Sequence, residues 1–520
     1  MSHINHVALN TAAGVSKYSY NIIYYLLFIS LLFFLILPQS SLAQGTKKVK
    51  FSAASMEVNK NMGNGAKRLL GNVQFNHEGA VMKCDSAYFY SDLNTLEAYS
   101  RVYINQADTL HLYGDFLEYD GNTKMAKVRK NVKLINRQTT LTTEALDYDL
   151  GQSIGYYTVP ANIINEDNKL YSRQGFYYVK SDLFFFKDSV RVINPKYEIN
   201  SDSLKYNTEI KTAYFNGPTH IYSDDNYIYC ERGWYNTETN ISQLNQNAFI
   251  ENANQIIKGD SLYYERETGF GRAVDQVELF DKEMDIILRG NFGLYNEQTE
   301  IALLTDSAQM IQITEEDSIY LHSDTIRSVL DTSGQKIIKA YFGVKIYKTD
   351  LQAKADSITY SFYDSIIRLY YDPVIWHEEN QLTADYIEIH TRNKKMDKML
   401  LENSSFIISQ KDTTVFNQMK GKRMVCFFRD NKLYKINVSG NGQTIYYPED
   451  DDNEFIGMNK AECSDLIIFL DEGDIDRINF LTKPDATMYP LQEAPENEKI
   501  LKGFKWHGQE RPRKKEDIFN

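Results

Sequence analysis

A five-residue phrase that begins with an acidic or polar residue and ends in an aromatic one recurs along the chain and decides its fold. Clear copies are DSAYF at 85–89, DFLEY at 115–119, EALDY at 144–148, DSLKY at 202–206, DSLYY at 260–264 and DSITY at 356–360. Thirteen copies begin at residues 85, 115, 144, 174, 202, 231, 260, 291, 324, 356, 385, 422 and 465, and the first seven steps are 28 to 31 residues long. A period of this length is typical of a stacked array of repeated units.

The phrase alternates in a way that fits a β-strand with one buried face. Side chains on a strand point to opposite sides in turn, so the third and fifth residues share one face. The third positions are mostly aliphatic, and a second alternating pair such as Val102 and Ile104 follows about 17 residues after each start. The pattern predicts an all-β, solenoid-like stack of about thirteen units of roughly 30 residues, with little helix.

The N-terminus reads as a secretory leader. Residues 22–37 form a run of sixteen residues without charge, and Ser41 and Ala43 occupy the small positions of a cleavage site. We therefore expect residues 1–43 to be a signal peptide, with an uncleaved membrane anchor as the alternative. The first cysteine is Cys84, so lipid attachment next to the leader is not expected.

Composition and motifs argue against several classes of function. The 57 Lys and Arg against 70 Asp and Glu give a net charge of −13, which disfavours a nucleic-acid partner. The four cysteines form no CxxC pair, so we expect buried free thiols, no metal site and no cofactor. The nine histidines are scattered, and His377-Glu378-Glu379 beside Trp376 is the nearest approach to a catalytic cluster, which we interpret as an exposed turn. We predict that the chain is not an enzyme.

These repeated phrases, followed by a second strand of the Val-x-Ile type, resemble the OstA/LptA-like family of lipopolysaccharide-transport proteins. The resemblance divides the chain into the signal peptide at 1–43, jellyroll repeats at 44–410, divergent terminal repeats at 411–480 and a polar C-terminal tail at 481–520. It implies an open β-jellyroll in the periplasm of a Gram-negative cell. It also implies that the apolar interior shields acyl chains while lipopolysaccharide passes toward the outer membrane, during outer-membrane assembly.

An apolar trough can hold acyl chains out of water while a charged head group stays solvated. The third-position side chains are therefore the candidates for contact with lipid: Leu117, Leu146, Phe176, Leu204, Leu262, Ile358 and Ile387. The sequence leaves open whether the interior is hollow or filled by such side chains. The expected partners are lipopolysaccharide and other jellyroll components of the transport machinery, joined by edge-to-edge strand pairing.

Two other functions are compatible with a β-repeat. One is a structural scaffold or surface protein, in which the aromatic fifth positions simply stack in the core. The other is a β-helix polysaccharide-active enzyme, in which the acidic starts of the phrases would bind Ca²⁺ on one face. Acidic residues that begin strands are more simply explained as turn-capping groups, which favours the transport hypothesis.

Overall fold

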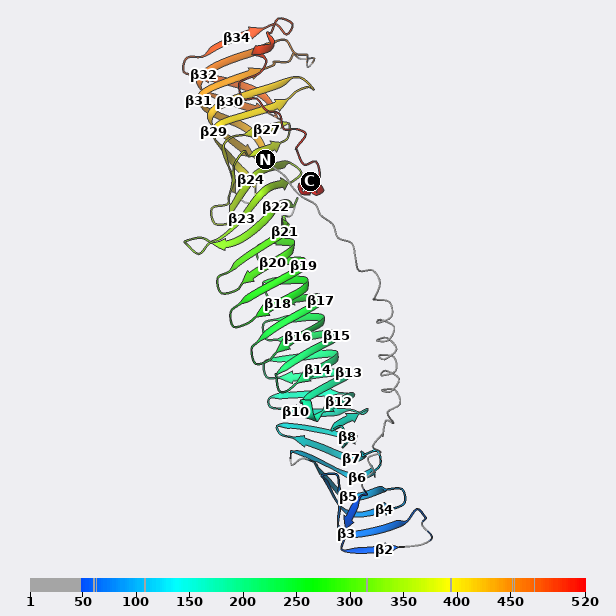
Figure 1. Cartoon of the computed structure of the whole chain (residues 1–520). Coiled ribbons are helices and arrows are strands. Elements are labelled where there is room, and N and C mark those ends of the chain that lie inside the picture. Colours follow the sequence, from blue (N-terminus) through cyan, green and yellow to red (C-terminus); the bar gives the residue numbers. More distant parts are fainter. Residues whose placement is uncertain are drawn as a thin grey trace, which may run out of the picture.

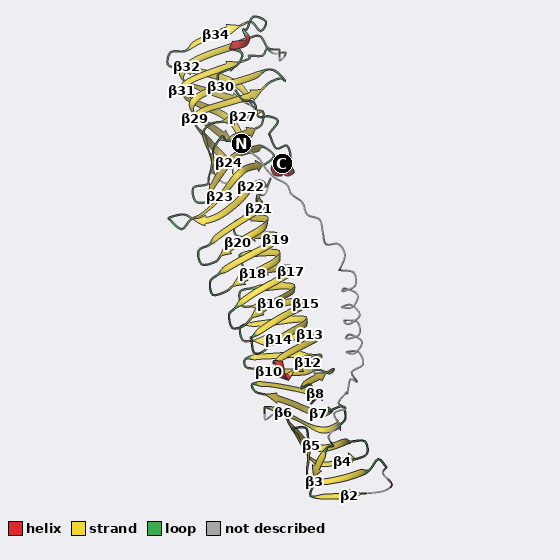
Figure 2. Cartoon of the chain, in the orientation of Figure 1, coloured by secondary structure: helices red, strands yellow, loops and turns green. Residues whose placement is uncertain are grey.

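The computed structural model describes residues 48–58, 61, 63–106, 109–314, 317–392, 395–450, 452, 454–471 and 473–520. Over these residues the chain forms one continuous antiparallel sheet that winds into a long, curved rod (Figure 1). The helical turns are short 3-10 segments (Figure 2). The expectation of an all-β repetitive, jellyroll-like stack is confirmed. The predicted signal peptide, residues 1–43, lies outside the described residues.

The strands follow one another along the rod, and most of them pair with their neighbours in sequence. The first seventeen are β1 Lys50–Ser52, β2 Ser55–Val58, β3 Ala66–His77, β4 Ala80–Tyr90, β5 Thr95–Gln106, β6 Leu110–Asp120, β7 Met125–Asn136, β8 Thr139–Asp149, β9 Ile154–Tyr157, β10 Ala161–Asn165, β11 Asn168–Ser172, β12 Gln174–Tyr178, β13 Leu183–Asn194, β14 Tyr197–Asn207, β15 Thr212–Ser223, β16 Tyr227–Asn236 and β17 Ile241–Glu251.

The second seventeen are β18 Gln255–Glu265, β19 Phe270–Asp281, β20 Ile286–Asn296, β21 Ile301–Gln312, β22 Ile319–Leu330, β23 Lys336–Tyr347, β24 Leu351–Ser361, β25 Ile366–Tyr370, β26 Val374–His377, β27 Asn380–Thr383, β28 Tyr386–Arg392, β29 Lys395–Gln410, β30 Phe416–Arg429, β31 Lys432–Tyr446, β32 Met458–Asp471, β33 Asp474–Leu481 and β34 Asp485–Tyr489. The 3-10 turns are η2 Val179–Ser181, η3 Glu496–Glu498 and η4 Lys515–Phe519.

Most long strands bend at their middle, and the bends line up as one corner of the roll. Between β6 and β7 the pairing register shifts after Tyr113, and Lys130 and Asn131 at the bend have positive φ angles of 64° and 49°. A bulge of this kind turns a strand sharply. The bends divide the strands into two half-sheets that face each other: a tyrosine half-sheet with segments such as 116–120, and an aliphatic half-sheet with segments such as 110–113. Opposite the corner, the hairpin turns of the two half-sheets meet along a line that we call the seam.

In several units the acidic residue that starts the phrase lies at the corner and pairs with a residue across the bend. Asp115 Oδ2 accepts a hydrogen bond of 2.6 Å from Asn131 Nδ2, and Asp85 forms an ion pair of 2.6 Å with Arg101. In both pairs the partner lies 16 residues after the acidic residue. The repeated carboxylates therefore have a structural role at the corner.

The third and fifth residues of the phrase face the interior, as the alternation predicted. Leu117 and Tyr119 are 0% and 2% exposed, whereas Glu118 between them points to solvent. The inward side chains of both half-sheets pack into one apolar cluster that extends from β3 to β32. Burial of these side chains is the main source of stability of the roll.

The residues after Pro490 run back along the outside of the roll and end beside β22 (Figure 1). We call residues 490–520 the strap. Two buried glutamines bind its backbone with both amide atoms: Gln418 pairs with Lys499 O and Leu501 N, each at 2.8 Å, and Gln381 pairs with Lys505 O at 2.7 Å and His507 N at 2.6 Å. Of the polar tail expected at 481–520, residues 485–489 form β34 of the sheet, and the strap that follows is a docked extended segment.

All four cysteines are buried and unpaired, as expected. Desolvation by burial raises the pKa of Cys84, Cys230 and Cys426 to about 12. In the part of the chain that the structure describes, none of the helical segments is long and apolar enough to span a bilayer.

Candidate functional site: a groove at the open seam

The seam is closed in the first part of the roll by contacts between its two edges. Such contacts join His77 to Tyr119 at 2.6 Å, Gln106 to Tyr148 at 2.8 Å, Arg137 to Asp182 at 2.7 Å and Lys211 to Glu166 at 2.8 Å. The partners are 42 to 45 residues apart, so each contact links one unit to a following one. Behind these contacts the interior is filled with side chains.

The seam opens in the middle of the roll. Beyond the ring contact of Tyr197 with Tyr235 (centroids 6.3 Å apart), the polar contacts between edge residues in the described part of the chain each stay within one edge until the edges meet again. Asn240 donates to Glu267 on one edge at 3.2 Å, and on the other Lys282 pairs with a neighbouring carboxylate. The edges meet again at Asp281 and Lys336, which lie 3.2 Å apart.

The opening leads into an apolar cavity of about 210 Å³, which we call the seam groove. The aliphatic half-sheet contributes Ile228, Ile250, Ile257 and Leu279, which are only partly buried. Leu112 and Leu134, from the same row in the filled part of the roll, are 0% exposed. The same stripe of aliphatic residues is thus core at one level of the roll and an accessible apolar surface at another.

Small residues hollow the groove on its tyrosine side. The third position of the phrase is leucine, isoleucine or alanine in most units, but it is Gly293 in one unit that lines the groove. Gly271 also lines the groove, and the nearest atom to a Cβ built there is Tyr295 O at 3.8 Å. This position therefore has room for a larger side chain, which would occupy the space of the groove.

Tyrosines of the fifth position line the groove on this same side, next to Gly271. Tyr264 Oη donates to Glu297 Oε2 at 2.6 Å, and Tyr295 lies beside it in the lining. Burial, and then the hydrogen bond to Glu297, raises the pKa of Tyr264 above its ordinary value. These hydroxyl groups stay protonated at neutral pH, so they add no charge to the groove.

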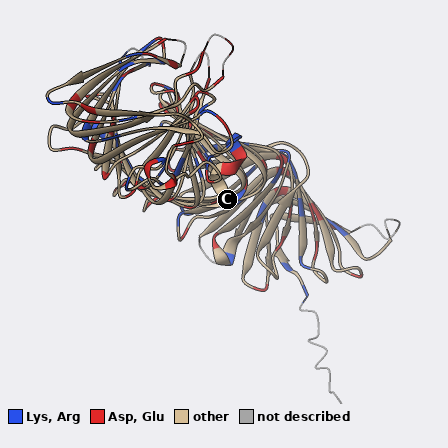
Figure 3. Ribbon diagram, turned by 90° about the horizontal axis from the view of Figure 1, so that it is seen from above, with Lys and Arg blue, Asp and Glu red and all other residues tan. Residues whose placement is uncertain are grey.

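The rim of the open stretch is acidic. Its turns carry the carboxylates Asp224, Asp225, Glu238, Glu267, Glu283, Asp285, Glu297 and Glu300, against the cations Arg266 and Lys282. Acidic and basic side chains are mixed over the rest of the roll (Figure 3). An anionic head group would find no general electrostatic attraction at this rim, so affinity has to come from contacts inside the groove.

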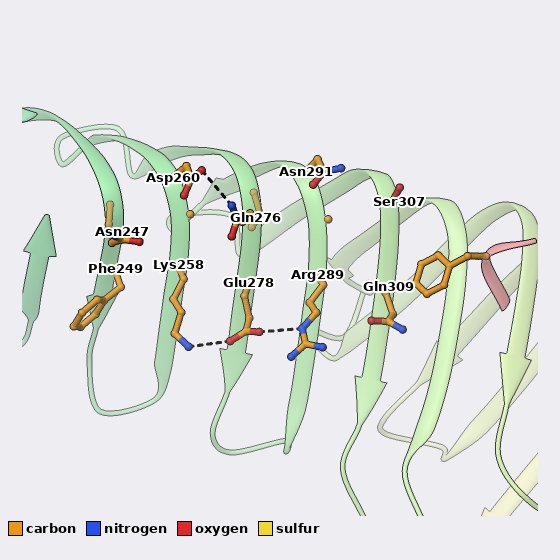
Figure 4. A pocket seen from close by; sticks show the side chains of 15 residues that line it. Asn247, Phe249, Lys258, Asp260, Gln276, Glu278, Arg289, Asn291, Ser307 and Gln309 are labelled. Carbon is orange, nitrogen blue, oxygen red and sulfur yellow. Dashed lines mark hydrogen bonds and ion pairs between the residues drawn. The ribbon is translucent and has the colours of Figure 1, made fainter. Parts of the chain in front are cut away.

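A second concave surface lies on the outer face of β17 to β21 (Figure 4). Its central feature is Glu278, which pairs with Lys258 at 3.0 Å and with Arg289 at 2.9 Å. Although burial raises the pKa of Glu278, the hydrogen bonds from these two cations lower it overall. The charges satisfy one another, and Phe519 of the strap lies at the end of this surface. The surface is polar and shallow, and the seam groove is the better candidate site.

The seven candidate lipid contacts occupy different levels of the roll. Leu262 lines the seam groove, and Leu204 lines a small cavity of about 40 Å³ next to the closed seam. Leu117, Leu146, Ile358 and Ile387 are packed in the filled interior, with 0 to 2% exposure. Phe176 faces outward and is 44% exposed, because the inward residues of its strand are Gly175 and Tyr177. The sequence prediction missed two kinds of groove residue. They are the side chains of the aliphatic half-sheet, such as Ile257, and the inward glycines Gly271 and Gly293.

The histidine cluster noted in the sequence is only partly an exposed turn: Glu378 and Glu379 form that turn after β26, but His377 and Trp376 do not belong to it. Trp376 and His377 belong to β26 and are each 1% exposed, and His377 Nε2 lies 2.8 Å from Asn431 O. Burial lowers the pKa of His377. Within the described ranges, no group of three or more His, Cys, Asp or Glu side chains is arranged to hold a metal ion.

A family model and a solved structure match parts of this chain. The family model described as OstA-like protein matches residues 47–202 and 220–319, which include β16 to β21 of the groove. Among solved structures, one similar chain is LptH of Pseudomonas aeruginosa, described as the LptA homologous periplasmic component of the conserved lipopolysaccharide transport device. It is 20% identical, with a TM-score of 0.18, and the match covers 19% of this chain and 76% of that one. A search of curated proteins gives no match. Over the matched residues the chain belongs to the family of OstA-like proteins.

Proposed function

We propose that this protein is a periplasmic lipopolysaccharide-transport protein that shields acyl chains in the seam groove. The main support for this proposal is a row of aliphatic side chains that continues the core and is open to solvent at the gap in the seam. The row consists of Ile228, Ile250, Ile257 and Leu279. Membership of the OstA-like family supports the same function. The proposal includes export through a signal peptide at residues 1–43 and no enzymatic activity.

The free energy of binding would come from the chains. Each methylene group removed from water contributes about 0.8 kcal/mol, so about ten buried methylenes contribute roughly 8 kcal/mol. This gain offsets the repulsion by the acidic rim and the entropy that is lost on association. The head group would lie outside the seam, in water. Because the rim repels anions, added salt should leave affinity for an anionic lipid unchanged or raise it.

The ends of the rod would join it to other jellyroll components. Among the described strands, β1 and β2 pair with β3 alone, and β33 and β34 pair with β32 alone, so an edge with unpaired backbone groups ends the described sheet on each side. Such edges accept another strand by backbone hydrogen bonding. Edge pairing at both ends would let the rod bridge toward the outer membrane.

The substitution Gly271→Leu tests the site because it fills the groove from a position with space for a side chain. Purified lipopolysaccharide should bind the wild-type protein and bind the variant at least tenfold more weakly. Ser261→Leu is the matched control, because Ser261 is on the outward face of the neighbouring strand β18. Equal binding by Gly271→Leu and the wild type would refute the groove as the lipid site, and no binding by the wild type would refute the proposed function.

A further inference from the structure

The row of fifth-position aromatics is interrupted next to the groove. Tyr264 and Tyr295 are followed in the next unit by Ser328, and Tyr360 resumes the row. The pairing places Ser328 opposite Ala302, and Ala302 opposite Tyr295, so all three side chains belong to the same inward row. A serine where the repeat has a ring removes the volume of that ring from the interior.

The missing ring leaves a small nook at the end of the groove. A cavity of about 60 Å³ is lined by Ser328, Asp281, Lys336 and Gln255 among others. It shares Leu279, Leu288 and Tyr295 with the lining of the seam groove, so the two spaces adjoin. The apolar groove therefore has one polar end, at β22, and its other end lies toward the closed seam, where Tyr235 contacts Tyr197.

The nook contains a hydroxyl group whose hydrogen-bonding capacity is unused. Ser328 is 5% exposed, and its Oγ atom is buried with no hydrogen-bond partner. Asp281 beside it is satisfied: Oδ1 accepts from the backbone N–H groups of Glu283 and Met284, and Oδ2 faces Lys336 Nζ at 3.2 Å. A buried polar group without a partner is unfavourable, and this one borders a cavity that opens into a ligand groove.

We propose that the nook binds a hydroxyl group carried near the head end of the acyl chain. A ligand hydroxyl can donate to Ser328 Oγ and accept from Lys336 Nζ, whereas the volume of about 60 Å³ is too small for a sugar or a phosphate with its oxygens. The chain would then extend from the nook toward Tyr235, and the head group would leave through the seam beside Lys336. This inference rests on the proposed function, and it specifies both the class of chain and its direction.

The test is calorimetric titration of the full-length protein with three probes: dodecanoate, 3-hydroxydodecanoate and 12-hydroxydodecanoate. The wild type should bind the 3-hydroxy chain about three- to tenfold more tightly than the plain chain, as expected for one added hydrogen bond. The 12-hydroxy chain should bind more weakly than the plain chain, because its hydroxyl would lie in the apolar end of the groove.

Ser328→Ala should remove the preference for 3-hydroxydodecanoate and keep the affinity for dodecanoate. Ser328→Tyr, which restores the ring of the repeat, should also remove the preference by filling the nook. Equal affinities of the wild type for the two chains, as for a nook that only holds water, would overturn the inference and leave the proposed function standing. A preference that persists in Ser328→Ala would also overturn it. Failure of all three probes to bind would count against the proposed function itself.

Discussion

The ammonium group of Lys336 lies 3.2 Å from the carboxylate of Asp281 and joins the two edges of the roll where the seam groove ends. The two residues are 55 positions apart in the chain, and their side chains are 28% and 9% exposed. A half-buried ion pair between two separate edges holds them together, and breaking it leaves a buried carboxylate without its cation.

Removing the ion pair between Lys336 and Asp281 should weaken the contact between the two edges of the seam at the end of the groove. We expect Lys336→Met to lower the free energy of unfolding by about 1 to 3 kcal/mol, because Asp281 keeps its charge in a buried place. Urea unfolding measures the change, and hydrogen exchange in β23 should increase. Lys395→Met is the control, since its ion pair with Asp430 is exposed and should contribute less than about 1 kcal/mol. Equal losses of unfolding free energy in the two variants would contradict a stabilising role of the Lys336–Asp281 ion pair.

The strap should come off the roll when its glutamine contacts are removed. Gln381 is 0% exposed and pairs with two backbone groups of the strap. Gln381→Ala leaves these groups unpaired, so we expect a loss of about 1 to 3 kcal/mol and faster hydrogen exchange in residues 499–507. Gln298→Ala, at an exposed glutamine bonded to Glu267 O, should leave exchange in the strap unchanged. Unchanged protection of the strap in Gln381→Ala would show that other contacts hold it.

The cysteines should be inert in the folded protein. The reactive form of a thiol is the thiolate, and burial raises the pKa of Cys84, Cys230 and Cys426 to about 12. At pH 8 we expect these thiols to react with a thiol reagent only after denaturation. Rapid labelling of any of the three in the native protein would show that the roll opens at that level.

Alkaline pH should destabilise the roll through its buried tyrosines. Burial raises the pKa of Tyr177 from 10.0 to about 12 in the folded state. A raised pKa means that the folded state keeps its proton while the unfolded state loses it, so stability is constant below about pH 10 and falls as the pH rises toward 12. Urea unfolding from pH 8 to 11 measures this slope. Tyr177→Phe should make the decline shallower, and an unchanged decline would assign it to other groups.

Much of the fold could be predicted because each unit repeats the same local pattern. The alternation around Leu117 and Tyr119 indicates a strand and its inward face, and it holds in nearly every unit. The prediction slipped by one residue at Phe176, because the unit begins at Arg173 and not at Gln174: its inward residues are Gly175 and Tyr177. A shift of one residue moves every side chain of a strand to the other face.

The site was harder to predict because it lies where small residues replace the usual third- and fifth-position side chains of the repeated phrase. Gly293 at a third position and Ser328 at a fifth position are visible in the aligned phrases as missing side-chain volume, and this signal could have located the groove. The opening of the seam could not be predicted, since its contacts join residues about forty or more positions apart in the chain. The strap was also hidden, because glutamines bind its backbone and leave no pattern in its own sequence.

The most direct test of the lipid groove is photo-crosslinking in the native host with a probe amino acid at Ile257 or at Lys258. These neighbours in β18 have opposite faces: Ile257 lines the groove, and Lys258 pairs with Glu278 on the outside. The proposed function predicts crosslinked lipopolysaccharide at position 257 and none at position 258. Lipid captured only at position 258, or at neither position while the protein is folded, would contradict it.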